Sequence, residues 1–379
     1  MKKAIIAAAV AGAFAVPSAM AADLSVNLEW GQALQFGETT TTAADGTTTS
    51  TDIQSIADAG RNRIKWNWTE TLDNGIGVHA YLVFGNLATS NGGSGASNAG
   101  GVDIRNAFIA FSGDFGTIHL GTNENFFELD MLTDVTYGDY GATADKIQHI
   151  NLGQTGFNFT RRDQESIWFH SKSMNGFDVR AAYIMGVNAD ANADEVGMQI
   201  GLRYNAGPLT ISVNQATYED FNAAGAQTGG AATAGTEAKA TSLNVTYDMG
   251  VLHIQAAMWD MEQSGLDVTT TSGANTTAVE ASGSGIQVEM PTANGIVFAA
   301  LSSIGDQDAT RAGASSAIID SGRDSWDVGY LHNMSSETYM FVRYGQREDG
   351  LNFTSTAGSV ESDELLFGWL LNYYIIMIY

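Results

Sequence analysis

The 379-residue chain has no cysteine and only three prolines, and its 17 lysines and arginines are far outnumbered by 42 aspartates and glutamates. Without cysteine, no disulfide can stabilise the fold, so hydrogen bonding and packing must do so. The shortage of clustered cations argues against a nucleic-acid partner. No segment has the pattern of a stable amphipathic helix or of a transmembrane helix. The 43 glycines favour strands and turns.

The first 21 residues have the pattern of a secretory signal peptide. Lys2 and Lys3 precede an apolar run over residues 4–16, and the small-x-small site Ala19-Met20-Ala21 follows. The apolar run is shorter than the roughly 20 residues of a membrane-spanning helix, which argues against a retained anchor. Cleavage after Ala21 removes two lysines and takes the formal net charge from −25 to −27. Residues 22–379 are then the mature domain.

Side chains alternate with a period of two along most of the mature sequence. In "RNRIKWNWTETL", the polar positions share one face and the apolar positions share the other. The polar set begins with Arg61, Arg63 and Lys65, and the apolar set is Ile64, Trp66 and Trp68. The segments 196–206 and 241–249 repeat this pattern, which is typical of strands with one apolar face.

Short turns and long loops separate the predicted strands in strict alternation. The seven short turns lie at 72–75, 113–116, 174–176, 205–208, 248–250, 293–295 and 333–336. The eight long loops lie at 38–60, 88–101, 123–163, 187–194, 220–237, 263–282, 304–322 and 348–362. Joining seven turns and eight loops takes sixteen strands of about ten residues, the length of a tilted membrane-spanning strand.

The predicted fold is therefore all-β, a sixteen-stranded antiparallel transmembrane β-barrel. The alternative is a soluble all-β protein such as a sandwich, which also alternates. Against it stand the even strand count, the confinement of short turns to one end and the aromatic residues near strand ends. Few strands are apolar on both faces, as the core of a sandwich would require.

Three segments resemble the general diffusion porins of Gram-negative outer membranes. They are "NRIKWNWTETLDNGIGVHAYLVF", "IRNAFIAFSGDFGTIHLGTN" and "RRDQESIWFHSKSMNGFDVRAAY". The resemblance extends over the mature chain in architecture, with its sharpest part over residues 61–185. It implies a homotrimer in outer-membrane lipid, each subunit with a water-filled pore that an inward-folded third loop narrows.

The resemblance also implies a constriction between an acidic loop and a basic wall. The loop would span about residues 123–163, where "DMLTD" and "YGD" match the acidic turn of the family. The family's Pro-Glu-Phe-Gly-Gly piece is absent, and "LTDVTYGD" stands in its place. The expected acidic set is Glu124, Glu128, Asp130, Asp134 and Asp139. The expected basic set is Arg61, Arg63, Lys65 and Arg105, with Arg161 or Arg162 on the next strand.

The assignment of Arg105 to the basic wall depends on the resemblance alone, because the period-two alternation of the sequence around it is poor. In "DIRNAFIAFSG", Arg105 has the same parity as Ala107, Ile109 and Phe111. The C-terminal segment "ELLFGWLLNYYIIMIY" raises a similar difficulty. It is predicted to be the last strand, because it is too short for a membrane helix. That strand would place Leu366, Leu370, Ile376 and Ile378 toward the lumen, and the pattern offers no reason for this.

The sequence predicts no enzyme, cofactor or metal site. Asp114-Phe115-Gly116 matches a kinase tripeptide, but no Gly-rich loop or His-Arg-Asp loop accompanies it, so we interpret it as a short turn. The six histidines, at 79, 119, 149, 170, 253 and 332, are scattered and lie in no recognisable triad context. The acidic run 190–195 lacks the spacing of a dedicated calcium loop.

The predicted function is an outer-membrane channel for passive diffusion of small hydrophilic solutes and ions. The net charge of −27 favours weak cation selectivity, although the basic wall opposes it. Two alternatives stay open. A substrate-specific sugar channel would show a row of inward-facing aromatic residues, and the sequence shows no clear row. A structural or adhesive barrel would have a lumen plugged by side chains.

Overall fold

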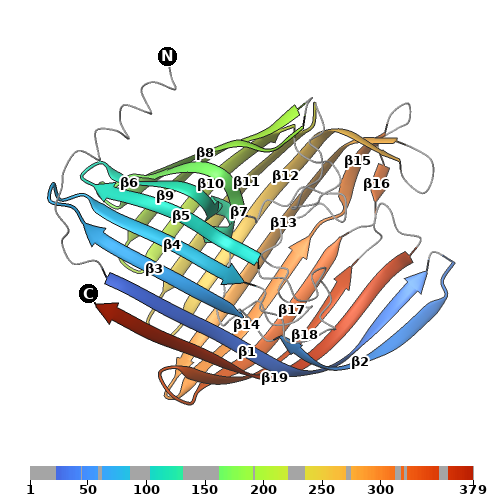
Figure 1. Cartoon of the computed structure of the whole chain (residues 1–379). Coiled ribbons are helices and arrows are strands. Elements are labelled where there is room, and N and C mark those ends of the chain that lie inside the picture. The colour runs from blue at the N-terminus through green and yellow to red at the C-terminus, as the bar shows by residue number, and fades with distance from the viewer. Residues whose placement is uncertain are drawn as a thin grey trace.

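The first and last strands pair with each other and close the barrel. In the computed structural model, β1 (Asp23–Ala43) is antiparallel to β19 (Ala357–Ile378), and their register runs from Asp23 opposite Ile378 to Ala43 opposite Ala357. Figure 1 shows the two strands side by side, blue against dark red. Because each N–H and C=O of the wall then has a neighbouring strand, the barrel can stand in hydrocarbon.

The structure describes residues 23–43, 45–58, 62–85, 103–130, 162–190, 193–220, 235–269, 275–311, 317–319, 322–349 and 357–378. The other strands are β2 (Thr48–Asp58), β3 (Arg63–Thr71), β4 (Gly77–Gly85), β5 (Asp103–Gly113), β6 (Gly116–Glu124), β7 (Arg162–His170), β8 (Phe177–Asp190), β9 (Ala193–Ala206), β10 (Leu209–Glu219), β11 (Glu237–Asp248), β12 (His253–Thr269), β13 (Asn275–Thr292), β14 (Gly295–Ile304), β15 (Gln307–Arg311), β16 (Ala317–Ile319), β17 (Arg323–Asn333) and β18 (Thr338–Asp349). A short helix, α2 (Phe126–Asp130), follows β6. Within the described residues, no helix is long and apolar enough to cross a membrane.

The described strands form a closed wall of sixteen, as predicted. β2 and β3 both pair with β1 and count as one interrupted strand. β14 pairs directly with β17, so β15 and β16 lie outside the ring. At the interruption, the Asn62 Oδ1 atom accepts a hydrogen bond of 2.8 Å from the Gly31 backbone N–H. This side chain satisfies a β1 donor where the ladder has a gap.

The seven short turns lie where the sequence predicts them, between paired consecutive strands. Several predicted long loops are wrong, because strands extend into them. The predicted loop 38–60 is mostly the β1–β2 hairpin, and β8 and β9 are separated by residues 191–192 alone. These strand ends are rich in threonine, serine and alanine, a composition that is also typical of loops. Their strand structure depends on pairing with the neighbouring strand, which the local sequence does not show.

The two faces of each strand differ in exposure in the way that the alternation predicts. On β9, Met198 is 56% and Ile200 is 56% exposed on the outer face, whereas Gln199 between them is 1% exposed. In a closed barrel the shielded face is the inner one, so polar side chains point inward and apolar ones toward lipid. The C-terminal segment is a strand, and its Leu366 and Leu370 pack on the inner side with Leu331 and Phe341. That apolar cluster explains two of the inward residues, and the side chains of Ile376 and Ile378 lie outside the described ones.

The closure predicts that a disulfide can lock β1 to β19. Thr39 Oγ1 and Ser362 Oγ lie 3.2 Å apart in directly opposed positions. Since the chain has no cysteine, the double variant Thr39→Cys/Ser362→Cys should form one disulfide on oxidation, visible as a shift in electrophoretic mobility that reductant reverses. Thr39→Cys/Glu361→Cys is the control, because residue 361 points to the other face. Equal cross-linking of both pairs would contradict the register.

Candidate functional site at the inner wall of the barrel

Two predicted basic residues lie on the inner wall beside a carboxylate of β1. Arg63 is opposite Glu29 in the β1–β3 register, and Lys65 follows on the same face. Lys65 Nζ donates a hydrogen bond to Glu29 Oε1 in an ion pair. Arg63 itself is only 7% exposed. The lumen orientation predicted for Arg63 and Lys65 is therefore confirmed, and Glu29 is an acidic neighbour that the sequence reasoning missed.

Arg105 also reaches the inner wall, through a β-bulge. Val83 pairs with Asn106 but Phe84 pairs with Ile104, so residue 105 is extra on β5. The Arg105 side chain lies against Gly85, on the face of Val83 and Lys65. A bulge re-aims the side chain at the extra residue. It therefore resolves the parity conflict that the sequence shows for Arg105.

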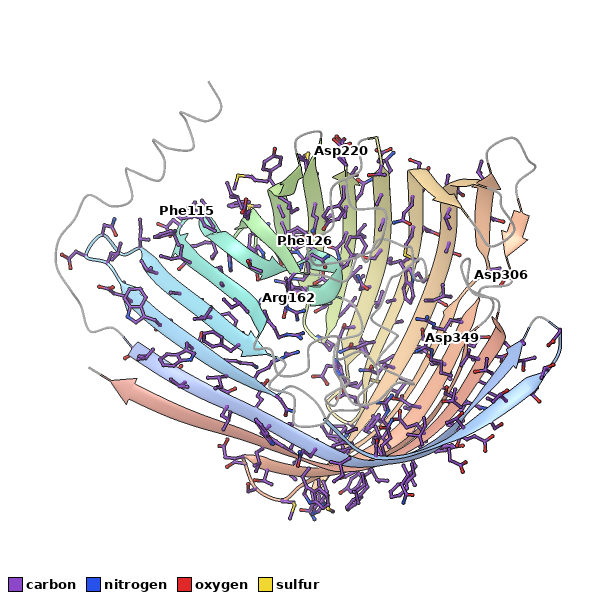
Figure 2. All side chains as sticks on the ribbon, turned by 45° about the vertical axis from the view of Figure 1, so that its right-hand side comes forward. Phe115, Phe126, Arg162, Asp220, Asp306 and Asp349 are labelled. Atoms are coloured by element: carbon purple, nitrogen blue, oxygen red, sulfur yellow. The ribbon has the colours of Figure 1, made fainter. Side chains whose placement is uncertain are left out.

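Glu124 lies where these cations converge. Arg162 Nη2 on β7 donates to Glu124 Oε1 at 3.0 Å, and the charges of Arg63 and Arg105 also act on this carboxylate. In the view of Figure 2, Arg162 lies just below Phe126. The structure thus brings the predicted acid Glu124 together with Arg63, Arg105 and Arg162. Of the two arginines considered for this strand, Arg162 is described and Arg161 lies outside the described residues.

Asp130 has a different partner from the one that the sequence indicated. It is bound by Arg180 of β8, whose Nη1 donates to Asp130 Oδ1 at 2.8 Å and whose Nη2 donates to Asp130 Oδ2. Asn214 Nδ2 donates to the same carboxylate at 2.9 Å. Arg180 is 1% exposed and lies 4.8 Å over the Phe126 ring. Asp130 therefore holds the loop base to its near wall, and the expectation that it faces the Arg63 row is wrong.

Both described ends of the third loop are anchored to β9 and β10. The Phe126 backbone N–H donates to Gln199 Oε1 at 3.0 Å. At the other end, Gln199 Nε2 donates to Asp163 Oδ2 at 2.6 Å, and the Tyr218 hydroxyl donates to the same atom at 3.0 Å. Phe126 and Phe127 are fully buried. A hydrogen-bonded buried network of this kind fixes the position of α2 on the inner wall.

The remaining predicted site residues cannot be placed. Arg61, Arg161, Asp134 and Asp139 lie outside the described residues, as do residues 131–161 of the predicted constriction loop and the predicted signal peptide 1–21. Glu128 is part of α2, but its side chain is not among those described.

A second group of inner-wall charges lies on β17 and β18, where the sequence reasoning named none. Arg343 Nε is 2.8 Å from Asp327 Oδ2, and both side chains are nearly fully buried. Asp349 forms ion pairs with both Arg323 and Arg347. Period-two parity within each strand could have found these cations. The pairing of Arg343 with Asp327 and of Arg323 with Asp349 depends on the cross-strand register, which the sequence does not show.

Four aromatic rings on the inner wall lie over glycines of the neighbouring strand. Each aromatic residue is directly opposite its glycine in the register. Because glycine has no side chain, the ring can lie against the wall at that position. A Cβ at Gly283 would stand 2.5 Å from the Trp259 ring, and a Cβ at Gly197 would stand 2.6 Å from the Tyr218 ring. The other two pairs are Phe298 with Gly329 and Phe341 with Gly368. Large side chains thus lie flat and leave room in the lumen.

The Asp-Phe-Gly tripeptide is a turn, as predicted. Residues 114–115 join β5 to β6, and Lys172 Nζ from the next turn lies 2.7 Å from Asp114 Oδ1. The hydrogen bond from Lys172, and then its charge, lower the pKa of the Asp114 carboxyl. Within the described part of the chain, no group of three or more histidines and acids is arranged to hold a metal ion.

Residues 7–350 match a family model described as "Gram-negative porin". An anion-selective porin from Comamonas acidovorans is 17% identical with a TM-score of 0.60, over 92% of this chain and 100% of that one. The in-vitro folded trimer form of OmpT from Vibrio cholerae is 13% identical with a TM-score of 0.63, over 93% and 100%. Salmonella typhi OmpF in complex with daunomycin is 13% identical with a TM-score of 0.60, over 93% and 97%. These structures share the fold. No curated protein matches the sequence significantly.

The Arg180–Asp130 pair predicts a large effect on stability. Arg180→Met leaves a buried carboxylate without its cation, which costs about 3–5 kcal/mol of unfolding free energy. Lys172→Met, which breaks the exposed pair with Asp114, should have little effect on stability, because solvent screens an exposed ion pair. Urea unfolding in lipid vesicles, followed by tryptophan fluorescence, measures both.

Adding Asp130→Asn to Arg180→Met removes the uncompensated charge and should recover part of the lost stability. A double variant at least as unstable as Arg180→Met, or equal effects of Arg180→Met and Lys172→Met, would contradict the anchoring role of the buried pair.

Proposed function

This chain belongs to the Gram-negative porin family, and we propose that it forms an open, water-filled channel for passive diffusion of small hydrophilic solutes and ions. It is an outer-membrane porin channel by family and fold. The observation that carries the proposal is the polar inner wall of a closed barrel. In this proposal the chain acts as a conduit and carries out no covalent chemistry.

The inner wall supports an open rather than a plugged lumen. Partly exposed polar side chains such as Lys65, Asn67, Thr210 and Thr246 lie on the inner face of β3, β10 and β11. The four rings that lie over glycines add apolar bulk without projecting across the barrel. Polar groups of this number need water or protein partners inside the barrel. A water-filled passage supplies them.

We propose that α2 narrows the pore. The helix is held on the inner side of β8–β10 by the Asp130–Arg180 pair and by Gln199. Near the N-terminal end of the helix, the charges of Arg63 on β3 and Arg105 on β5 act on the Glu124 carboxylate of β6. Opposed charges in a narrow aqueous passage orient polar solutes and disfavour apolar ones.

The proposed assembly is a homotrimer in outer-membrane lipid. It rests on the family resemblance and on the trimer form known for the structurally similar OmpT. We further propose weak cation selectivity. Several described inner-wall cations pair with neighbouring carboxylates, as Lys65 does with Glu29 and Arg343 with Asp327, which offsets part of their charge. The excess of acids over bases in the whole chain then sets the sign.

Reconstitution into a planar bilayer tests the channel directly. Insertion in KCl should give stepwise current increases in groups of three, because each subunit of a trimer carries its own pore. Purified protein that inserts without any steps would contradict an open pore and favour the plugged structural barrel. Single steps of one size would contradict the trimeric assembly but not the open channel.

The reversal potential in a KCl gradient tests the selectivity. We expect a weak preference for K⁺ over Cl⁻. Arg63→Gln should increase that preference, because it removes a cation from the inner wall. Lys239→Gln is the control, because it also removes one positive charge but from the outer face of β11. The neighbouring Ala238 and Ala240 are buried on the inner face, and Lys239 between them is exposed. Anion selectivity of the unaltered protein would contradict the proposed cation preference. An Arg63→Gln variant with unchanged selectivity would contradict the placement of Arg63 in the pore.

A further inference from the structure

Five rings form a continuous band on the inner wall, where the sequence indicated no row of inward aromatic residues. They are His79 and Tyr81 on β4, Phe108 on β5, His119 on β6 and His170 on β7. The register places Tyr81 opposite Asn67 and Phe108, and His79 opposite Thr69, on the face of the lumen residue Lys65. His119 and His170 continue this face across β6 and β7. The rings come from four separate strands, which is why the sequence alone shows no clear row.

Neighbouring rings of this ring band contact one another. The ring centroids of Tyr81 and Phe108 are 5.4 Å apart, and those of Phe108 and His119 are 4.9 Å apart. His119 and His170 follow at 5.2 Å. All are tilted arrangements within the range that aromatic pairs prefer. The ring band crosses four neighbouring strands and thus presents one strip of rings, two of them benzene rings and three of them imidazoles, on the inner wall.

The ring band is held in place from both ends. His79 Nε2 lies 2.8 Å from Asn67 Oδ1, which fixes the orientation of the imidazole. At the other end, His170 contacts the ring of Phe126 with centroids 5.7 Å apart, and Phe126 packs edge-to-face on Trp168 at 4.9 Å. Phe126 and Trp168 are fully buried. A ligand that stacks on rings fixed in this way loses little entropy in ordering them.

The five rings differ from the inner-wall rings that lie over glycines in being partly exposed. Trp259 is 2% and Tyr218 is 0% exposed, whereas every member of the ring band has intermediate exposure. Packing against neighbouring residues therefore buries Trp259 and Tyr218 almost completely. Each residue of the ring band, in contrast, keeps part of its surface exposed on the inner face. Exposed, preorganised ring surface is what a second aromatic ring binds.

We propose that the ring band is a binding subsite for solutes that carry a planar aromatic ring together with a polar or cationic group. The proposal rests on the proposed channel function, since the solute must enter the lumen. Stacking and edge-to-face contacts select the flat π-face, and the polar group stays in the water of the pore. Such solutes are retained during passage more than saturated rings of the same size and charge.

The test compares benzylammonium with cyclohexylmethylammonium in single-channel recordings. The two cations have the same charge and similar size, and only benzylammonium has an aromatic face. We expect benzylammonium to reduce the open-channel current with an apparent affinity about three- to tenfold higher, the range expected for one added aromatic contact. A merely apolar strip would favour cyclohexylmethylammonium, and that result or equal affinities would overturn the proposal.

Variants locate the effect. Phe108→Leu keeps an apolar side chain but removes the central ring, and Tyr81→Leu removes its neighbour, so each should abolish the preference for benzylammonium. Phe367→Leu is the matched control, because Phe367 lies opposite Val342 and Leu34 on the outer face. Preference retained in both inner variants would overturn the assignment to the ring band.

The two proposals fail in different ways. A channel that conducts KCl but does not distinguish the two cations contradicts the ring band alone. Absence of conductance in KCl without either cation contradicts the channel, and with it the subsite that depends on entry.

Discussion

Backbone hydrogen bonding in a medium without water is the constraint on which the rest of this structure depends. A strand whose N–H and C=O groups face hydrocarbon must pair on both sides, so the pairing of β1 with β19 is a requirement of the membrane. Closure separates an inner from an outer face and gives each strand its alternation. Where the ladder breaks between β2 and β3, the Asn62 side chain supplies the missing acceptor.

Closure also makes the lumen crowded, and two kinds of contact relieve the crowding. Aromatic side chains lie over glycines on the strand beside them, as Trp259 does over Gly283. Charged side chains pair with carboxylates of an adjacent strand or of α2, as Arg343 does with Asp327 and Arg180 with Asp130. Both contacts keep side chains close to the wall. The passage is therefore defined by cross-strand partners.

The sequence predicts what depends on neighbours along the chain. Alternation and turn residues are local, so the sixteen strands, the seven short turns and the inward orientation of Arg63 and Lys65 could be predicted. Partners across strands are not local. The bulge at Arg105 requires the register of β4 against β5, and the attachment of Asp130 to Arg180 requires the position of α2. The ring band joins residues from four strands, and only His79 and Tyr81 are near each other in the sequence.

Cysteine accessibility along one strand in lipid tests the central claim most directly, because the natural chain has no cysteine. Single variants at residues 64–67 of β3 would be treated with a charged, water-soluble thiol reagent in reconstituted vesicles. The account predicts rapid labelling at Lys65 and Asn67, which are partly exposed on the inner face, and protection at Ile64 and Trp66, which face lipid. Equal labelling at all four positions, or the inverse pattern, would contradict a polar lumen inside a membrane barrel.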